Sequence, residues 1–181
     1  MVTTKSLSTL MLVSATLSLM FVTLASGGVV FAKQKFTASL SGSNEVPPVK
    51  INAGGEAKFT SVNNDTGLKY KVNVTGLSDA TGAHIHTGKE GKNGAVVVDL
   101  LKNSKKNSVA AGMVIRGNIT DSSLTGPMKG KTVADLISAM SSGDAYVNIH
   151  TPKHPKGEIR GQLESGNSSS TMSNQTNVQV G

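Results

Sequence analysis

The stretch Tyr146–Leu163, with the sequence YVNIHTPKHPKGEIRGQL, alternates apolar and polar residues on both sides of a loop. Successive side chains of an extended strand point to opposite faces, so the alternation predicts two strands. The seven residues Thr151–Gly157 between them are a suitable hairpin connection. The register that this connection favours contains three cross-strand pairs: His150 with Glu158, Asn148 with Arg160, and Tyr146 with Gln162.

A second phrase, Ala83–Gly88 (AHIHTG), alternates in the same way. It places Ile85 on one face of a strand and both His84 and His86 on the other. Residues two apart on a strand lie about 6.5 to 7 Å apart on the same side, so the two imidazoles can converge on one ion with bonds of about 2.0 to 2.1 Å. If this strand neighbours the one that ends at His150, three imidazoles share a polar face.

Three imidazoles on one face predict a candidate metal site. Neutral imidazole suits copper, zinc or nickel, and copper(II) has the highest affinity of the divalent ions, so we expect copper first and zinc second. His154, in the loop, is a fourth candidate ligand. The polar residues expected around the site, either to support the ion or to bind an anion, are Glu158, Arg160, Asn148, Tyr146 and Gln162. Two alternatives stay open: an organic anion held by Arg160 and the histidines, and histidines that are surface residues only.

Residues 1–32 have the pattern of an export signal. Lys5 is followed by an apolar stretch from Leu10 to Leu24 and by a small-residue cleavage site at Val30–Ala32. An uncleaved membrane anchor is the alternative, because the uncharged stretch is long enough for the roughly 20 residues of a spanning helix. The Ser and Thr residues in the stretch favour cleavage. We therefore expect a secreted or extracytoplasmic protein, free or attached to the cell surface, which enters the membrane only if this segment is retained.

The rest of the chain, about 150 residues, is the length of one domain. It contains no cysteine, so its stability must come from packing or from a bound ion rather than from disulfides. We expect a folded domain at 33–163. Residues 164–181, rich in Ser, Asn, Thr and Gln, are expected to form a disordered tail.

Alternating segments separated by Gly- and Asn-rich turns predict further strands at 35–41, 56–62, 67–75, 95–101 and 112–119. One helix is expected at 132–142, with Thr132 and Asp135 as its capping box and Gly143 at its end. The double proline in Glu45–Val49 predicts an edge or a rigid connector. About eight short strands and one helix predict an all-β, Greek-key-like antiparallel β-sandwich, with a closed barrel as the alternative.

The net charge is +7, and loose lysine clusters lie at 102–106, 129–131 and 153–156. Such a surface suits anionic envelope glycans or lipids. Nucleic acid is not expected, because aromatic residues, which stack on bases, make up only 3% of the chain. Candidate glycosylation sites of the Asn-x-Ser/Thr type occur at Asn64, Asn73, Asn118, Asn167 and Asn174.

The sequence contains no hydrolase motif and no phosphate-binding loop, so no catalytic residue is assigned. An enzyme is the less favoured interpretation. Three functions stay open: an exported binding module for a transition metal, a structural or adhesive envelope protein without a metal, and a copper redox enzyme.

Several separated phrases, in the right order, resemble the CHRD domain family, which is named after chordin. The match runs from about Phe36 to Leu163 and consists of Phe36-x-Ala38-x-Leu40-x-Gly42, Glu45-Val46-Pro47-Pro48-Val49, Gly55-x-Ala57, Ala83-His84-Ile85-His86-x-Gly88, Gly94-x-Val96-Val97, Tyr146-Val147-Asn148-x-His150-Thr151 and Gly157-Glu158-Ile159-Arg160-Gly161-Gln162. The resemblance implies an extracellular, β-sandwich-like module. In chordin such repeats belong to an antagonist of secreted growth factors, but this chain has none of the cysteine-rich modules, so that role is not implied.

A weaker likeness is to Cu/Zn superoxide dismutase, which also carries a His-x-His pair on a β-sandwich strand. By this analogy His84, His86 and His150 would be copper ligands. This chain has no evident zinc subsite and no disulfide, so the likeness does not imply dismutase activity.

Overall fold

The structure is a computed structural model that describes residues 32–77, 79–102, 104–109 and 112–166. The export signal expected at 1–32, apart from its last residue, and the polar tail from residue 167 onward lie outside the described residues. In the part of the chain that is described, no helix is both long enough and apolar enough to cross a membrane.

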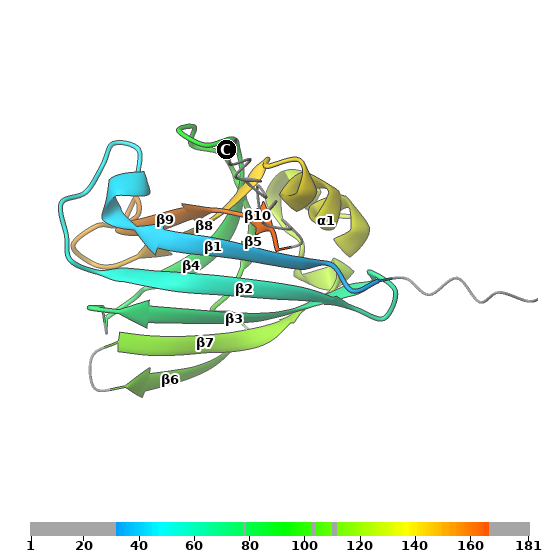
Figure 1. Ribbon diagram of the computed structural model, residues 1–181, viewed down its shortest axis with the longest axis horizontal. Coiled ribbons are helices and arrows are strands. Elements are labelled where there is room, and N and C mark those ends of the chain that lie inside the picture. The colour runs from blue at the N-terminus through cyan, green and yellow to red at the C-terminus, as the bar shows by residue number, and fades with distance from the viewer. Residues whose placement is uncertain (1–31, 78, 103, 110–111, 167–181) are drawn as a thin grey trace, which may run out of the picture. The chain divides into compact units, whose positions relative to one another are not determined.

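Ten strands of the described residues form one antiparallel sheet (Figure 1). In chain order they are β1 (Lys35–Ser41), β2 (Gly54–Val62), β3 (Gly67–Thr75), β4 (Gly82–Thr87), β5 (Val96–Asp99), β6 (Lys105–Val109), β7 (Gly112–Ile119), β8 (Ala145–His150), β9 (Ile159–Gln162) and β10 (Glu164–Ser165). Hydrogen-bonded neighbours follow the order β5-β4-β8-β9-β1-β2-β3-β7-β6, and β10 pairs with β1. Strands that are distant in the sequence, such as β4 and β8, therefore lie side by side.

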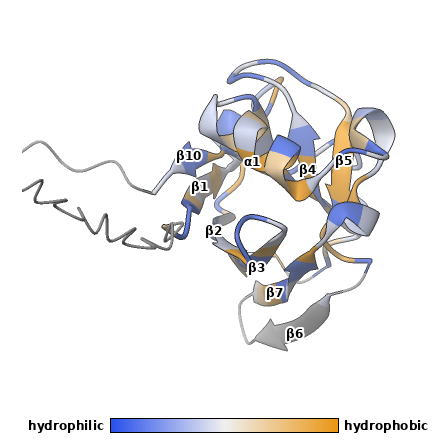
Figure 2. Cartoon of the chain, turned by 90° about the vertical axis from the view of Figure 1, so that its right-hand side faces the viewer, coloured by the Kyte–Doolittle hydropathy of each residue, from blue (hydrophilic) through white to orange (hydrophobic). Residues whose placement is uncertain are grey.

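The sheet folds over so that its β4–β5 side lies opposite its β3–β7 side, with hydrophobic residues between them (Figure 2). Residues after β7 complete this arrangement, because the Thr125 amide donates to the Val97 carbonyl at 2.9 Å and Leu124 forms a bridge with Val98. The Tyr70 hydroxyl of β3 donates to the Leu100 carbonyl, just after β5, at 2.7 Å. These bonds join the two halves across the core.

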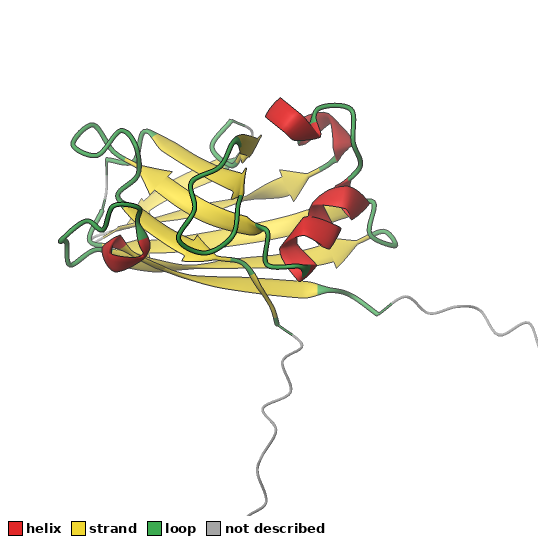
Figure 3. Ribbon diagram, turned by 90° about the horizontal axis from the view of Figure 1, so that it is seen from above, coloured by secondary structure: helices red, strands yellow, loops and turns green. Residues whose placement is uncertain are grey.

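One α-helix, α1 (Val133–Ser141), lies against β3, β8 and β10. Figure 3 shows the helices in red beside the yellow strands. Thr132 and Asp135 form the expected capping box, in which the Thr132 side chain accepts from the Asp135 amide. Its buried stripe is Val133, Leu136, Ile137 and Met140. Three 3-10 turns complete the elements: η1 (Gly42–Asn44), η2 (Asp121–Ser123) and η3 (Gly126–Met128).

Alternation along the strands builds the core, as the sequence predicts. In β1 the side chains of Phe36, Ala38 and Leu40 are buried. Leu68, Tyr70, Val72 and Val74 form the matching buried set on β3, and Val147, Ile149, Ile159 and Leu163 continue it on β8 and β9. Burial of such side chains stabilises the fold by about 25 cal/mol for each Å² of apolar surface removed from water.

The all-β antiparallel fold with one helix is confirmed, with three differences from the prediction. The strands belong to one continuous, folded sheet rather than to two separate sheets. The edge strand β6 was not expected, because its sequence KKNSV is polar, a composition that suits an edge paired on one side only. Glu164 and Ser165, expected in the tail, pair with β1 as β10 because the chain leaves β9 along the edge of β1.

Removal of the Tyr70 hydroxyl is expected to weaken the contact between the β3 side and the β5 side of the folded sheet. Burial raises the pKa of Tyr70 to about 12, so the hydroxyl stays protonated and donates to Leu100 at neutral pH. Tyr70→Phe leaves the buried carbonyl without this donor, which we expect to lower the free energy of unfolding by about 1–3 kcal/mol in urea denaturation. The control Ser142→Ala, which removes an exposed bond at the end of α1, is expected to cost less than about 0.5 kcal/mol. Equal losses in the two variants would contradict this role of Tyr70.

Candidate metal site

The candidate site lies on one face of three neighbouring strands, β4, β8 and β9. The β8–β9 register pairs Tyr146 with Gln162 and Asn148 with Arg160, as the sequence predicts. The β4–β8 register pairs His86 with Tyr146, His84 with Asn148, and Gly82 with His150. These two registers bring His84, His86 and His150 to the same face, which confirms the predicted convergence.

The three imidazoles are close enough to share an ion. One nitrogen from each of His84, His86 and His150 lies within 4.8 Å of the others. His84 Nδ1 and His150 Nε2 are 3.0 Å apart, within hydrogen-bonding distance. The ring of His86 has its centroid 5.8 Å from that of His84 and 6.0 Å from that of His150. The β4–β5 register shifts by one residue between Ile85 and His86, so that His86 pairs with Val96.

Two backbone carbonyls determine which ring nitrogens carry protons. His86 Nδ1 lies 3.0 Å from the Gly94 carbonyl, and His150 Nδ1 lies 3.1 Å from the Pro155 carbonyl. A carbonyl only accepts, so Nδ1 of both rings carries a proton and Nε2 of both rings has the lone pair. The lone pair of His150 Nε2 accepts from His84 Nδ1. His86 is 8% exposed, and its Nε2 is buried without a hydrogen-bond partner. Carbonyls that orient imidazoles in this way are common behind the histidine ligands of metal sites.

The surroundings keep these imidazoles neutral. Burial lowers the pKa of His84, His86 and His150 below the ordinary histidine value of 6.5. The pKa of His84 is lowered further by His150, and that of His86 by His150 and Arg160. Only the neutral ring offers a lone pair to a metal. Because of these shifts, the three rings stay able to bind a metal at lower pH than an ordinary histidine.

Gly82 leaves the space in which two of the rings meet, and the sequence pattern did not indicate this role. A Cβ atom at Gly82 would lie 3.0 Å from His84 Cε1 and 3.2 Å from His150 Cδ2. Gly82 stands directly opposite His150 in the β4–β8 register. A side chain here would push against both imidazoles.

A stack of three side chains supports His86. The ring of Tyr146 lies parallel to that of His86, at 4.9 Å between centroids and an interplanar angle of 10°. The Arg160 guanidinium covers the other face of Tyr146, with Cζ 3.5 Å from the ring centroid. Stacked guanidinium and aromatic planes attract each other, so the stack holds His86 in place.

Arg160 and Gln162 also attach the loops that cover this face. Arg160, 1% exposed, donates to Asn93 Oδ1 and to the carbonyls of Lys89 and Lys92 at 2.8 to 3.1 Å. Gln162 Nε2 donates to the carbonyls of Gly88, Gly143 and Ala145. The face is thus covered by the β4–β5 loop, where the sequence suggested a half-exposed surface. Asn93 and Gly94, which the sequence reasoning missed, belong to this cover.

A buried carboxyl, Glu45, lies beyond Asn148, which donates to Glu45 Oε2 at 3.2 Å. Burial raises the pKa of Glu45 to about 7, although Arg160 and the bond from Asn148 act in the opposite direction. Glu158, also buried, accepts from the Thr151 hydroxyl. Glu45 escaped the sequence reasoning because it stands in the double-proline phrase, which indicated only a connector.

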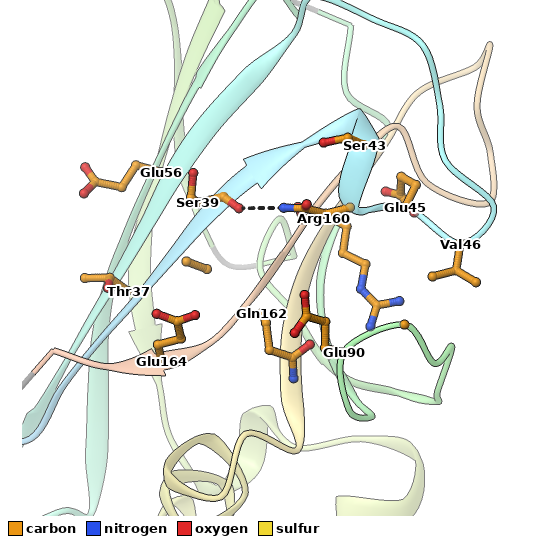
Figure 4. A pocket seen from close by; sticks show the side chains of 13 residues that line it. Thr37, Ser39, Ser43, Glu45, Val46, Glu56, Glu90, Arg160, Gln162 and Glu164 are labelled. Atoms are coloured by element: carbon orange, nitrogen blue, oxygen red, sulfur yellow. Dashed lines mark hydrogen bonds between the residues drawn. The ribbon is translucent and has the colours of Figure 1, made fainter. Parts of the chain in front are cut away.

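The surroundings of Arg160 do not favour an organic anion as the ligand. A cavity of about 570 Å³ beside Arg160 is lined by four acidic side chains, those of Glu45, Glu56, Glu90 and Glu164 (Figure 4). The guanidinium already makes three hydrogen bonds to oxygens of the β4–β5 loop. An anion would therefore meet repulsion from the exposed carboxylates and a cation that is already partly engaged.

His154 lies apart from the three-histidine group. It is in the hairpin loop and lines a separate groove with Val46, Pro47 and Pro155. Among the described residues, the group of potential ligands contains His84, His86 and His150 alone. The geometry therefore gives no support to His154 as a ligand.

The candidate glycosylation sites lie on two regions. Asn64 is exposed in the β2–β3 turn, whereas Asn73 and Asn118 lie on β3 and β7. Asn167 and Asn174 are outside the described residues. Modification of these residues stays a prediction.

The fold and the site define an antiparallel β-sheet domain with a loop-covered cluster of three neutral histidines. Residues 36–163 match the CHRD domain, and the chain belongs to this family. It is 29% identical over 143 residues to Chordin of Xenopus laevis and 27% identical over 138 residues to Chordin of Danio rerio. Each alignment covers 75% of this chain but only 13% or 14% of the relative. The chain thus spans about one seventh of the length of these curated relatives.

Glu45→Gln is expected to flatten the dependence of stability on pH between about 4.5 and 7. The folded-state pKa of Glu45, about 7, lies above the ordinary value of 4.5, so the unfolded chain releases its proton first. The stability contributed by the protonated form is present below pH 4.5 and is lost as pH rises through 7. Gln stays neutral at every pH. In urea denaturation from pH 4.5 to 8, the free energy of unfolding of the wild type should therefore fall relative to that of the variant, by about 3 kcal/mol at most.

The exposed carboxylate Glu90, which lines the same cavity, provides the matched control. Glu90→Gln should follow the wild-type pH profile. Parallel profiles for Glu45→Gln and the wild type would show that Glu45 is ionised in the folded protein, contrary to this prediction.

Proposed function

We propose that this chain is an exported CHRD-domain module that binds one transition-metal ion through His84, His86 and His150, with copper as the first choice and zinc as the second. The observation that carries the proposal is the convergence of one ring nitrogen from each of the three histidines within 4.8 Å. In addition, His86 Nε2 is buried without a hydrogen-bond partner. Buried polar atoms almost always have such a partner, so this nitrogen supports a ligand-binding role for the cluster.

The geometry fits an ion after small side-chain movements. In a tetrahedral site with bonds of about 2.0 to 2.1 Å, ligand nitrogens lie about 3.3 Å apart. The pair His84 Nδ1 and His150 Nε2, at 3.0 Å, is already near this spacing. The three ligand nitrogens lie within 4.8 Å of one another, so His86 has to approach the other two rings to share an ion with them. A bound ion would replace the His84–His150 hydrogen bond and use the lone pair of His86.

The donor set favours copper or zinc. Three neutral nitrogen ligands without a thiolate suit copper(II) and zinc, and copper(II) binds more tightly in the general affinity order. Three protein ligands leave a coordination position for water or another small ligand. His84 and His150 are only partly buried, so this position is accessible from solvent.

We place this activity outside the cytoplasm on the pattern of residues 1–32, which combines Lys5, an apolar stretch and a small-residue cleavage site. The absence of cysteine agrees with a site built only from imidazoles, which needs no reduced thiol. The partners and activity of the much longer Chordin proteins are not carried over to this chain.

The proposal is tested by metal titration of the full chain, purified without an affinity tag and freed of metal. Equilibrium dialysis against copper(II) or zinc, followed by elemental analysis, should give one ion per chain. His84→Ala/His86→Ala should weaken binding at least about 100-fold, because each variant chain keeps only one of the three ligands. His154→Ala is the matched control and should bind as the wild type does.

Two results would overturn the proposal: no binding by the wild type, or equal binding by the wild type and the double variant. Thermal denaturation without metal shows whether the double variant is folded. For copper(II), electron paramagnetic resonance should show coupling to three nitrogens in the wild type and in His154→Ala.

Gly82→Ala is expected to impair metal binding without removal of any ligand. The new Cβ would stand 3.0 Å from His84 and 3.2 Å from His150, so the two rings must separate. We expect about a 10-fold weaker affinity for copper(II) in the same dialysis experiment, a loss similar to that caused by changes behind metal ligands. Gly91→Ala, at an open position in the β4–β5 loop, is the control, although its φ of 70° adds some backbone strain. Unchanged affinity in Gly82→Ala would show that the rings have room to adjust.

A further inference from the structure

A second surface of the domain carries an unusual row of positive charges. The outer side of β1, β2, β3 and β7, which lie side by side in Figure 1, is exposed, whereas the inner side forms the core. The exposed cations on this side, hereafter the cationic face, are Lys35, Lys58, Lys69, Lys71 and Arg116. These residues come from four strands and are scattered through the sequence.

The strand registers bring these cations into direct contact range. Lys58 on β2 pairs with Lys71 on β3, and Lys71 pairs with Arg116 on β7. Neighbouring strands are about 4.8 Å apart, so three cations stand in a line across three strands. Lys69 lies two residues from Lys71 on the same side, and Lys35 is opposite Thr60 beside the line. The cationic face therefore consists of two adjacent rows.

These charges are poorly neutralised within the protein. On these four strands the outer side has one carboxylate, Glu56, which forms an ion pair of 2.9 Å with Lys58. No ion pair within 4.0 Å involves Lys69, Lys71 or Arg116 among the described residues. Like charges directly opposite each other destabilise a sheet. An external anion removes this repulsion, so the arrangement favours a partner with several negative charges.

We infer that the cationic face binds a linear anionic polysaccharide, whose carboxylate, sulfate or phosphate groups pair with Lys69, Lys71 and Arg116. A chain with repeated negative charges matches a line of cations, because the strand registers fix the spacing of the backbone positions from which these cations project. A lipid surface fits less well. Peripheral membrane binding usually adds apolar side chains that insert among the lipids, and the exposed positions here are Lys, Arg, Glu, Thr, Ser and Asn.

The cationic face is independent of the histidine cluster. It is formed by β1, β2, β3 and β7, whereas the histidines belong to β4 and β8. Two candidate glycosylation sites, Asn73 and Asn118, share the cationic face, since Asn118 pairs with Lys69. A glycan on either residue would compete with a bound polysaccharide, so the test uses protein from a bacterial host, which adds no such glycan.

The experiment compares two triple variants of the full chain on immobilised dextran sulfate, with neutral dextran as the blank. The first, Lys69→Gln/Lys71→Gln/Arg116→Gln, removes three charges from the cationic face. The second, Lys129→Gln/Lys131→Gln/Lys153→Gln, removes three exposed charges elsewhere. We expect at least a 10-fold loss of affinity at 0.15 M salt for the first variant and less than a 3-fold loss for the second. Thermal denaturation checks that both are folded.

Equal losses in the two triple variants would overturn the inference, because binding would then follow net charge alone. Tight binding of the wild type to vesicles that contain anionic lipid, with no binding to dextran sulfate, would also overturn it and indicate a membrane partner. His84→Ala/His86→Ala should bind dextran sulfate as the wild type does. Failure of metal binding and failure of polysaccharide binding are thus separate outcomes.

Discussion

The register between β4, β8 and β9 is the constraint on which the site depends. Side chains alternate along a strand, so a shift of one residue would exchange the two faces and bury Arg160 or Glu158 in the apolar core at a large cost. The observed pairs, Asn148 with Arg160 and His84 with Asn148, place every apolar residue of these strands inward. The same hydrophobic burial that fixes the fold therefore fixes the direction of the three imidazoles.

The polar face is buried, and this sets its chemistry. Arg160 makes three hydrogen bonds to loop carbonyls and Asn93, which partly compensate its charge although it is almost inaccessible to water. Burial lowers the pKa values of the three histidines, although Asp99 and the carbonyls of Gly94 and Pro155 act in the opposite direction on His84, His86 and His150, respectively. One cationic side chain and three neutral imidazoles thus share a covered face, with Tyr146 stacked between Arg160 and His86.

Periodicity in the sequence was sufficient to predict most strands, the helix cap at Thr132 and the common face of His84 and His86, whereas their meeting with His150 required that β4 and β8 be neighbours. These features depend on alternation and on short-range spacing, which a sequence displays directly. The cover over the site was not predictable, because it depends on long-range contacts such as Arg160 with Lys92. The roles of Gly82 and Glu45 were not predictable for the same reason, because they depend on residues that lie across a strand pair or a loop. The cationic face was missed because its members occur far apart and meet only through the order of the strands.

Buried atoms without partners show where packing and function compete in this domain. His86 Nε2, Asn148 Oδ1 and Glu45 Oε1 are all buried without a hydrogen-bond partner. Each such atom lowers the stability of the domain, typically by about 1–3 kcal/mol, because water is lost and nothing replaces it. A fold selected for stability alone would place apolar side chains or complete bonds here. His86 and Asn148 lie on the paired strands β4 and β8, and Glu45 is hydrogen-bonded to Asn148, whereas the apolar core is a continuous cluster. This loss of stability is therefore located on the covered polar face. Incomplete hydrogen bonding of this kind is expected at sites that bind ligands.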